Sequence, residues 1–307
     1  MRTLAVLWLL GCLLGGPALA GAKTLRVVTT LFPWFDFART IGQDQAEVSL
    51  LLPPGVEAHT YAPTPRDLER IAQADVFIYS GPSMEPWVED LLAGLQLKHT
   101  RVVNVSEGVK AGASAEPHAG GIEHSGHDNG PDPHFWLDPQ LASQAVTVIE
   151  QALSAQAPDQ AKVFHLHAGA LRRELASLDA EIAQGLQQCR SRELVSAGHS
   201  AFAYFARRYH LHMHAAYPGF SPNAEPSPRA LAHLVEDIRR LGVRTIFYEE
   251  LIEPRVARAL AAETGVAMLP LHGAHNLSAA DRERGLTYLQ LMRENLRRLK
   301  QGLGCEP

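Results

Sequence analysis

The chain has 307 residues, of which 46% are hydrophobic, and a formal net charge of −5. This length favours two domains of roughly 100–150 residues each, and the acidic balance, without any basic run, argues against nucleic acid as a partner. The unusual count is that of histidine, which occurs fifteen times.

The N-terminus is typical of an export signal. Met1-Arg2 supplies a positive charge, Leu4–Leu14 an apolar run and Ala18-Leu19-Ala20 a small-residue cleavage site. The run is shorter than the roughly 20 residues that span a bilayer. We therefore expect residues 1–20 to be a cleaved signal peptide. A lipid-anchored form is the alternative, because Leu9-Leu10-Gly11-Cys12 loosely resembles a lipoprotein cleavage box.

Strands and helices alternate through the first half of the mature chain. Strands are predicted at residues 24–30, 48–52, 76–79 and 102–105. The second strand runs into a loop that holds His59, Thr64-Pro65 then caps a helix, and Pro86 opens another.

Residues 106–133 differ in composition, being rich in Gly, Ala, His, Ser, Asp and Pro, with Ile122 as the one large apolar residue. Such a stretch buries too little surface to repay its ordering entropy, so a mobile loop is predicted. Its histidines His118, His124 and His127 are interpreted as a flexible arm that gathers metal weakly; a solvated loop that happens to contain histidine is the alternative.

The loop leads into Asp132-Pro133-His134-Phe135-Trp136-Leu137-Asp138-Pro139. Pro133 limits the backbone freedom of His134, the apolar residues that follow favour burial, and Asp138-Pro139 is a helix start. An imidazole held this rigidly is interpreted as a metal ligand.

A helix is predicted from Pro139 to about residue 157, and a second from Pro158 towards Cys189. The second carries an apolar stripe formed by Val163, Leu166, Ala170, Leu171, Leu175, Leu178 and Ile182. Its roughly 30 residues would span about 45 Å, so it is interpreted as a rigid strut between two lobes.

The second half repeats the alternation, with strands predicted at residues 194–197, 211–217, 245–248 and 266–271. Ser227-Pro228 caps one helix, and Ser278 with Asp281 is expected to cap a final helix that reaches Leu303. The predicted fold is α/β: an N-terminal lobe at 21–157, a linking helix at 158–189 and a C-terminal lobe at 190–307, each lobe holding a parallel sheet flanked by helices.

Histidines follow the ends of four predicted strands. These positions are His59, His134, His199 and the pair His272 and His275, about 65 to 75 residues apart. In open α/β sheets ligands bind beyond the carboxyl ends of strands. The spacing therefore predicts that imidazoles from both lobes meet in one pocket.

Five motifs occur in order along the chain: Leu52–Gly55 with His59–Pro65, Asp132–Pro139, Ala197–Phe205, Glu225–Ser227 and Tyr288–Leu296. With these motifs and the long central helix, the chain resembles the cluster A-I metal-binding proteins of bacterial ABC importers, the zinc/manganese class, over nearly its whole mature length. The resemblance implies a periplasmic, monomeric protein that captures a metal ion between its lobes. It also implies delivery of that ion to a permease and its ATPase at the inner membrane.

By this resemblance His59, His134 and His199 are metal ligands. The fourth ligand of the family is usually a carboxylate after the last strand, but no Asp or Glu precedes Asp281 there, so His275 is expected, with His272 or water as alternatives. Imidazole nitrogen suits Zn²⁺ better than Mn²⁺, and manganese members carry Glu at the position of His199. Zinc is therefore expected, with orienting carboxylates to be sought among Glu57, Glu225, Glu249 and Glu250.

Two further patterns leave alternatives open. Cys189 and Cys305 would share an oxidising compartment and are expected to form one disulfide, the alternative being two unpaired thiols. His210, His212 and His214 alternate with apolar residues, which predicts one strand face with all three; a polar face is favoured over a second metal site.

Other functions compete with import. An exported metallohydrolase would need an open coordination position and a general base, and no His-Glu-x-x-His motif occurs. An adhesin could use the same histidine site. We expect no enzyme and favour the importer component.

Overall fold

The structure is a computed structural model that describes residues 24–111, 131–217 and 226–306. The expected signal peptide at 1–20, with the alternative lipid anchor at Cys12, lies outside the described residues. So do the loop histidines His118, His124 and His127, and Glu225.

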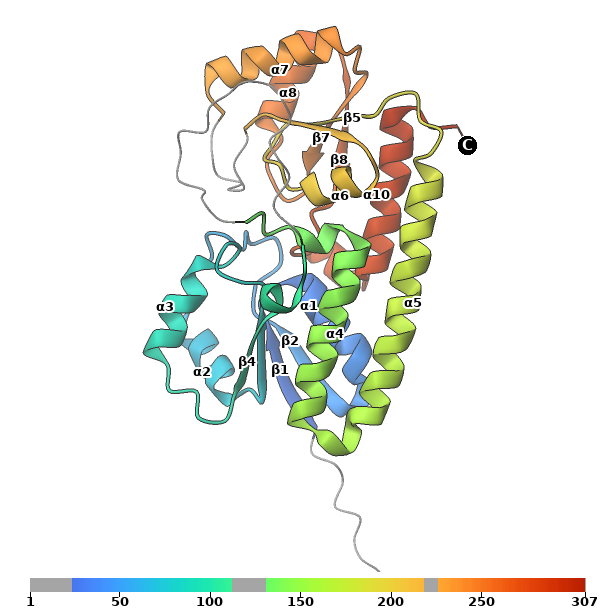
Figure 1. The fold of residues 1–307 in the computed structure, drawn as a ribbon. Helices are drawn as coiled ribbons and strands as arrows, with labels where there is room; N and C mark the ends of the chain where they lie inside the picture. The colour runs from blue at the N-terminus through green and yellow to red at the C-terminus, as the bar shows by residue number, and fades with distance from the viewer. Residues whose placement is uncertain (1–23, 112–130, 218–225, 307) are drawn as a thin grey trace, which may run out of the picture.

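Two four-stranded parallel sheets form the two lobes (Figure 1), which confirms the predicted α/β class. The N-terminal sheet has the order β2-β1-β3-β4, with β1 Leu25–Thr29, β2 Ala46–Leu50, β3 Val76–Tyr79 and β4 Arg101–Asn104. The C-terminal sheet has the order β6-β5-β7-β8, with β5 Glu193–Ser196, β6 His212–Ala215, β7 Thr245–Glu249 and β8 Ala267–Leu271. In the first sheet Val27 lies opposite both Val48 and Val76.

Ten α-helices occur among the described residues and connect these strands. They are α1 Phe32–Gly42, α2 Pro65–Gln73, α3 Pro86–Gly94, α4 Pro139–Gln156, α5 Ala161–Gly185, α6 Ala203–Arg208, α7 Pro228–Arg240, α8 Arg255–Thr264, α9 Ala279–Glu283 and α10 Tyr288–Leu303. The expected caps are present: Thr64 forms a capping box with Asp67 at α2, and the Asp138 and Ser227 side chains accept backbone N–H groups at α4 and α7. Among the described residues no helix combines the length and the apolar character that crossing a bilayer requires.

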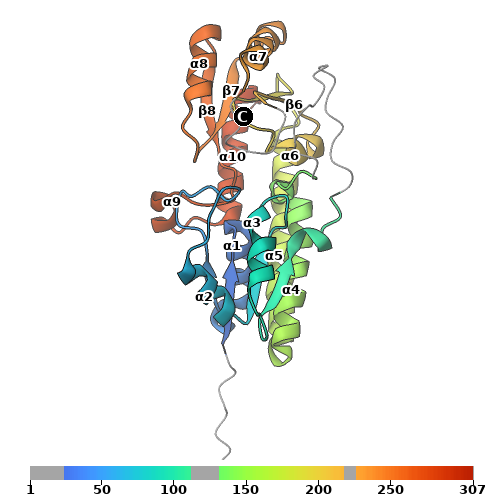
Figure 2. The same ribbon diagram turned by 90° about the vertical axis from the view of Figure 1, so that its left-hand side faces the viewer.

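One hydrophobic core continues from the first lobe into the second. It takes in Ile78 of the first sheet, Leu178 of α5, Leu271 of the second sheet and Leu299 of α10, all of them buried. Figures 1 and 2 show α5 and α10 side by side, with α5 extending along both lobes. A disulfide between Cys189 and Cys305 ties the ends of these helices together, as expected.

The strut between the lobes differs from the expected helix in its length and in its buried face. The strut, α5, has 25 residues and ends at Gly185, short of Cys189, so it is about 38 Å long. Its buried face starts with Phe164 and Ala168, whereas the expected Val163 and Leu166 are exposed. Contact with α1 and α4 selects this face, which sequence spacing alone could not show.

The final helix and the flanks of the predicted loop also differ. Ser278 caps the five-residue helix α9, and a separate capping box at Thr287 opens α10. Gly285 lies between the two helices with φ +65°, a conformation that favours glycine. At the loop, a 3-10 helix spans Val105–Gly108, Val109 and Ala111 pack against the core, and Asp132 is buried.

Candidate metal centre

Three histidines that are far apart in the chain meet between the lobes. His59 follows β2, His134 precedes a 3-10 helix at Phe135–Leu137, and His199 follows β5. Each offers one ring nitrogen, and these nitrogens all lie within 4.8 Å of one another. His134 and His199 are buried and His59 is half-buried. The predicted meeting of strand-end imidazoles is therefore present in the structure for these three.

Carboxylates fix which ring nitrogen faces the centre. Nδ1 of His134 lies 2.9 Å from Oδ1 of Asp132, and Nδ1 of His199 lies 2.7 Å from Oε1 of Glu249. When these carboxylates are ionised they only accept hydrogen bonds, so each Nδ1 carries a hydrogen. In the neutral rings the Nε2 lone pairs then point into the centre, the arrangement found where a carboxylate orients a metal-bound histidine.

The two Nε2 atoms of His134 and His199 are 3.2 Å apart. Two facing lone pairs at this distance repel unless a proton or a cation lies between them. Two nitrogens bound to one tetrahedral Zn²⁺ at about 2.0–2.1 Å would themselves be about 3.3 Å apart. The spacing of these rings therefore fits two ligands of one zinc ion, and equally a hydrogen bond from a protonated His199 to His134 when no ion is bound.

Burial and mutual proximity keep two of the imidazoles neutral. Burial and the neighbouring His134 together lower the pKa of His59 to about 3. Burial and the nearby His199 hold the pKa of His134 well below its usual range. Both rings thus offer lone pairs at neutral pH.

His199 behaves differently because of its carboxylate partner. Burial alone would lower the pKa of His199, but the buried Glu249 carboxylate outweighs this and raises it. Asp132 is also perturbed, since burial raises its pKa to about 7. A cation entering the centre would displace a proton from His199, and the acceptor role of Asp132 would weaken in mildly acidic solution.

His275, the expected fourth ligand, lies beside the three-histidine group and faces a carboxylate. Its Nε2 is 3.3 Å from Oε2 of Glu57, and Oε1 of Glu57 accepts the backbone N–H of His59 at 3.3 Å. Burial would raise the pKa of Glu57, but His275 and His59 lower it well below its usual range. The backbone of His275 is anchored as well, because its carbonyl accepts the N–H of Phe32 at 2.8 Å.

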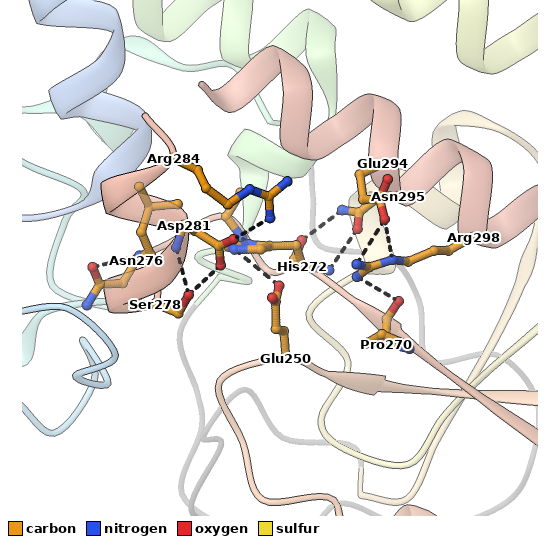
Figure 3. A network of polar contacts seen from close by, with 12 residues as sticks. Glu250, Pro270, His272, Asn276, Ser278, Asp281, Arg284, Glu294, Asn295 and Arg298 are labelled. Carbon is orange, nitrogen blue, oxygen red and sulfur yellow. Dashed lines mark hydrogen bonds and ion pairs between the residues drawn. The ribbon is translucent and has the colours of Figure 1, made fainter. Parts of the chain in front are cut away.

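His272 belongs to a different cluster. Figure 3 shows it between Glu250 and Asp281, and the ligand atoms of these three residues lie within 4.8 Å of one another. Its Nδ1 accepts the N–H of Ala274 at 2.9 Å, so the neutral ring carries its hydrogen on Nε2, the nitrogen 3.3 Å from Oε2 of Glu250. A metal on Nε2 would need this hydrogen to move to Nδ1, where it would oppose the N–H of Ala274, which argues against His272 as a ligand of either cluster.

The structure divides the four carboxylates considered from sequence. Glu249 faces His199, Glu57 faces His275 and Glu250 faces His272, while Glu225 lies outside the described residues. Asp132 was not identified from sequence. Its only signal was its position two residues before His134, whose backbone N–H it also accepts at 2.9 Å.

Trp136 is buried beside the imidazole of His134. Its ring centroid is 5.3 Å from that of His134, and its Nε1 donates to the carbonyl of Gly273 at 2.8 Å. This hydrogen bond joins the motif around His134 to the segment after β8, with both partners buried. Sequence reasoning placed Trp136 in a buried anchor but could not identify its partner.

The chain matches the family model described as zinc-uptake complex component A, periplasmic, over residues 27–302. It is 34% identical over 303 residues to the zinc-binding lipoprotein AdcA of Streptococcus pneumoniae R6, which covers 98% of this chain and 60% of that protein. It is 32% identical over 290 residues to the high-affinity zinc uptake system protein ZnuA of Bacillus subtilis 168, covering 94% of this chain and 90% of that protein.

A solved structure agrees with these relatives. The Zn(II)-bound ZnuA-like domain of Streptococcus pneumoniae AdcA is 33% identical in sequence, with a TM-score of 0.75, and the match covers 92% of this chain and 99% of that domain. The chain therefore corresponds to one domain of AdcA and spans about 60% of the full protein.

Proposed function

Since this chain belongs to the family of the periplasmic zinc-uptake complex component A, we propose that it captures Zn²⁺ between its lobes and delivers it to an ABC permease and its ATPase. One observation supports zinc capture above all others. The Nε2 atoms of His134 and His199 are 3.2 Å apart, with carboxylates holding the hydrogens on the opposite ring nitrogens.

His59, His134 and His199 are the proposed ligands, and His275 is the proposed fourth. His275 would reach the ion by exchanging its contact with Glu57 for one with the metal. An all-nitrogen set favours Zn²⁺ over Mn²⁺, which prefers oxygen donors. The buried Glu249 and the half-buried Glu57 offset the ion's charge without entering its coordination shell.

Zinc binding can be tested directly on the purified protein. A competition titration with a zinc chelator should give one tight site in the wild-type chain, and the His134→Ala/His199→Ala variant should lose it. His99→Asn is the matched control because His99 lies in an exposed segment, outside the three-histidine group. Equal tight binding by the double variant and the control would contradict the proposed site.

Import is tested separately in cells. Deleting the gene should slow growth in zinc-depleted medium, the wild-type gene should restore it, and the double variant should not. An exported adhesin or metallohydrolase using the same histidines would bind zinc equally well in the titration. Unchanged zinc accumulation after deletion would therefore reject the importer role while leaving the zinc site standing.

The proposed location is the periplasm, reached through the export signal, with the lipid-anchored form as the alternative. Fractionation of cells that express the full chain, followed by measurement of its mass, distinguishes the two. A mass that starts at Gly21 fits cleavage after Ala20, whereas a diacylglycerol adduct on Cys12 would show the anchored form.

A further inference from the structure

A second group of histidines lies on the edge strand of the C-terminal sheet, away from the central site. His212 and His214 are on β6, two residues apart, so their side chains leave the same face of the strand. The neighbouring strand β5 places Glu193 opposite His212 in the register. Glu193 begins β5, whereas His199 of the central site follows the end of that strand.

The Glu193 carboxylate lies between the two imidazoles. Its Oε1 is 2.9 Å from Nδ1 of His212, and its Oε2 is 2.6 Å from Nε2 of His214. Burial would raise the pKa of Glu193, but the hydrogen bonds from both histidines lower it. The group is therefore an anion flanked by two imidazoles.

Asp237 of α7 lies on the far side of His214. Its Oδ2 is 3.9 Å from Nδ1 of that ring, while its Oδ1 accepts from Arg240 at 2.5 Å. If Nε2 of His214 bound a metal, the hydrogen of the neutral ring would move to Nδ1 and point towards Asp237. At 3.9 Å the two atoms do not form a hydrogen bond, and a shift of about 1 Å as the ring turns towards Asp237 would give the carboxylate–histidine–metal arrangement that orients a ligand.

We propose that His212, His214 and Glu193 form a second Zn²⁺ site, with Asp237 orienting His214. Two imidazole nitrogens and one carboxylate oxygen are a common zinc donor set, and water can complete the tetrahedron. On binding, the hydrogen of each neutral ring would move to its other nitrogen, Nε2 of His212 and Nδ1 of His214, and the imidazoles would close around the ion as the carboxylate turns. Binding here is weaker than at the centre, because the His212 side chain is 61% exposed and the ligands must rearrange.

His210 does not belong to this site, contrary to the expected three-histidine strand face. It precedes β6 in a turn with φ 55°, a conformation that breaks the alternation of side chains along the strand. It is exposed and two residues from His212, so it serves as a matched control.

The experiment measures zinc per chain after dialysis of the full-length protein against buffered micromolar Zn²⁺. His212→Asn/His214→Asn should hold one zinc fewer than the wild type, and His210→Asn should hold the wild-type number. Glu193→Gln, which keeps the side-chain volume, should also lose that zinc and provides a second route if the double variant folds poorly. In His134→Ala/His199→Ala the second zinc should remain, so failure of the central site is distinguishable from failure of this one.

Location is checked by chemical modification. Zinc should protect His212 and His214 from diethyl pyrocarbonate, read by peptide mass spectrometry, and should leave His210 reactive. If the variants at His212, His214 and Glu193 hold as much zinc as His210→Asn, or if zinc gives no protection, the group is a hydrogen-bonded polar face and the proposal is overturned.

Discussion

Replacing Glu249 by Gln should weaken zinc binding about tenfold while leaving the fold intact. The carboxylate is buried and 2.7 Å from Nδ1 of His199, which would place it about 6 Å from an ion on Nε2. At an effective dielectric constant of about 20, the carboxylate would attract a Zn²⁺ ion there by about 5 kcal/mol. It would attract the proton that zinc displaces from His199, roughly 4 Å away, by about 4 kcal/mol. Before rounding, the difference is about 1.4 kcal/mol, which is a tenfold change in affinity.

The assay is a chelator competition titration at neutral pH, with Glu250→Gln as the control. Glu250 is the next residue along the chain, but its carboxylate faces His272 rather than His199. We expect Glu249→Gln alone to lose affinity and Glu250→Gln to match the wild type. Wild-type affinity in both variants would refute the role assigned to Glu249, and an equal loss in both would show a general disturbance of the β7 end.

Three further predictions follow from the same geometry. A 100-fold excess of Zn²⁺ over its Kd should stabilise the fold by about 2.7 kcal/mol. Calorimetry should show that His134→Ala abolishes most of this gain and that deletion of residues 112–130 leaves it intact. A larger loss in the deletion variant than in His134→Ala would show that the main site lies elsewhere. Because the pKa of His199 is raised, its proton competes with zinc first as pH falls, so affinity should drop by about tenfold per pH unit below that pKa; a chelator titration that stays flat from pH 8 to 5 would argue against histidine ligation. Cys189→Ser/Cys305→Ser opens a loop of 116 residues and should lower the free energy of unfolding in urea by about 2–4 kcal/mol, an effect that a reductant should reproduce only in the wild type.

The features of the fold that depend on neighbouring residues, such as helix caps, could be predicted from sequence. Thr64, Asp138 and Ser227 cap helices because their side chains accept backbone N–H groups within a few residues. The face of α5 was missed because it depends on contacts with α1 and α4. Val163 fits the apolar period as well as Phe164 does, yet only Phe164 is buried.

The site shows the same division. The positions of His59, His134 and His199 follow from strand order, since the carboxyl ends of parallel strands share one edge of a sheet. The proposal of His275 rather than His272 as the fourth ligand depends on a distance, the 2.9 Å from the backbone N of Ala274 to Nδ1 of His272. Identifying Asp132 required the orientation of the His134 ring, which the sequence does not contain.

The continuous interior along α5 and α10 has a consequence for transport. Parting the lobes would expose apolar surface of this shared core, at a cost of about 25 cal/mol per Å², which opposes a wide opening between the empty and loaded forms. In the proposed importer, a permease that distinguishes the two forms would sense a local difference at the rim formed by the strand-end loops. Recognition of the loaded form would then depend on the orientation of a few side chains around the ion.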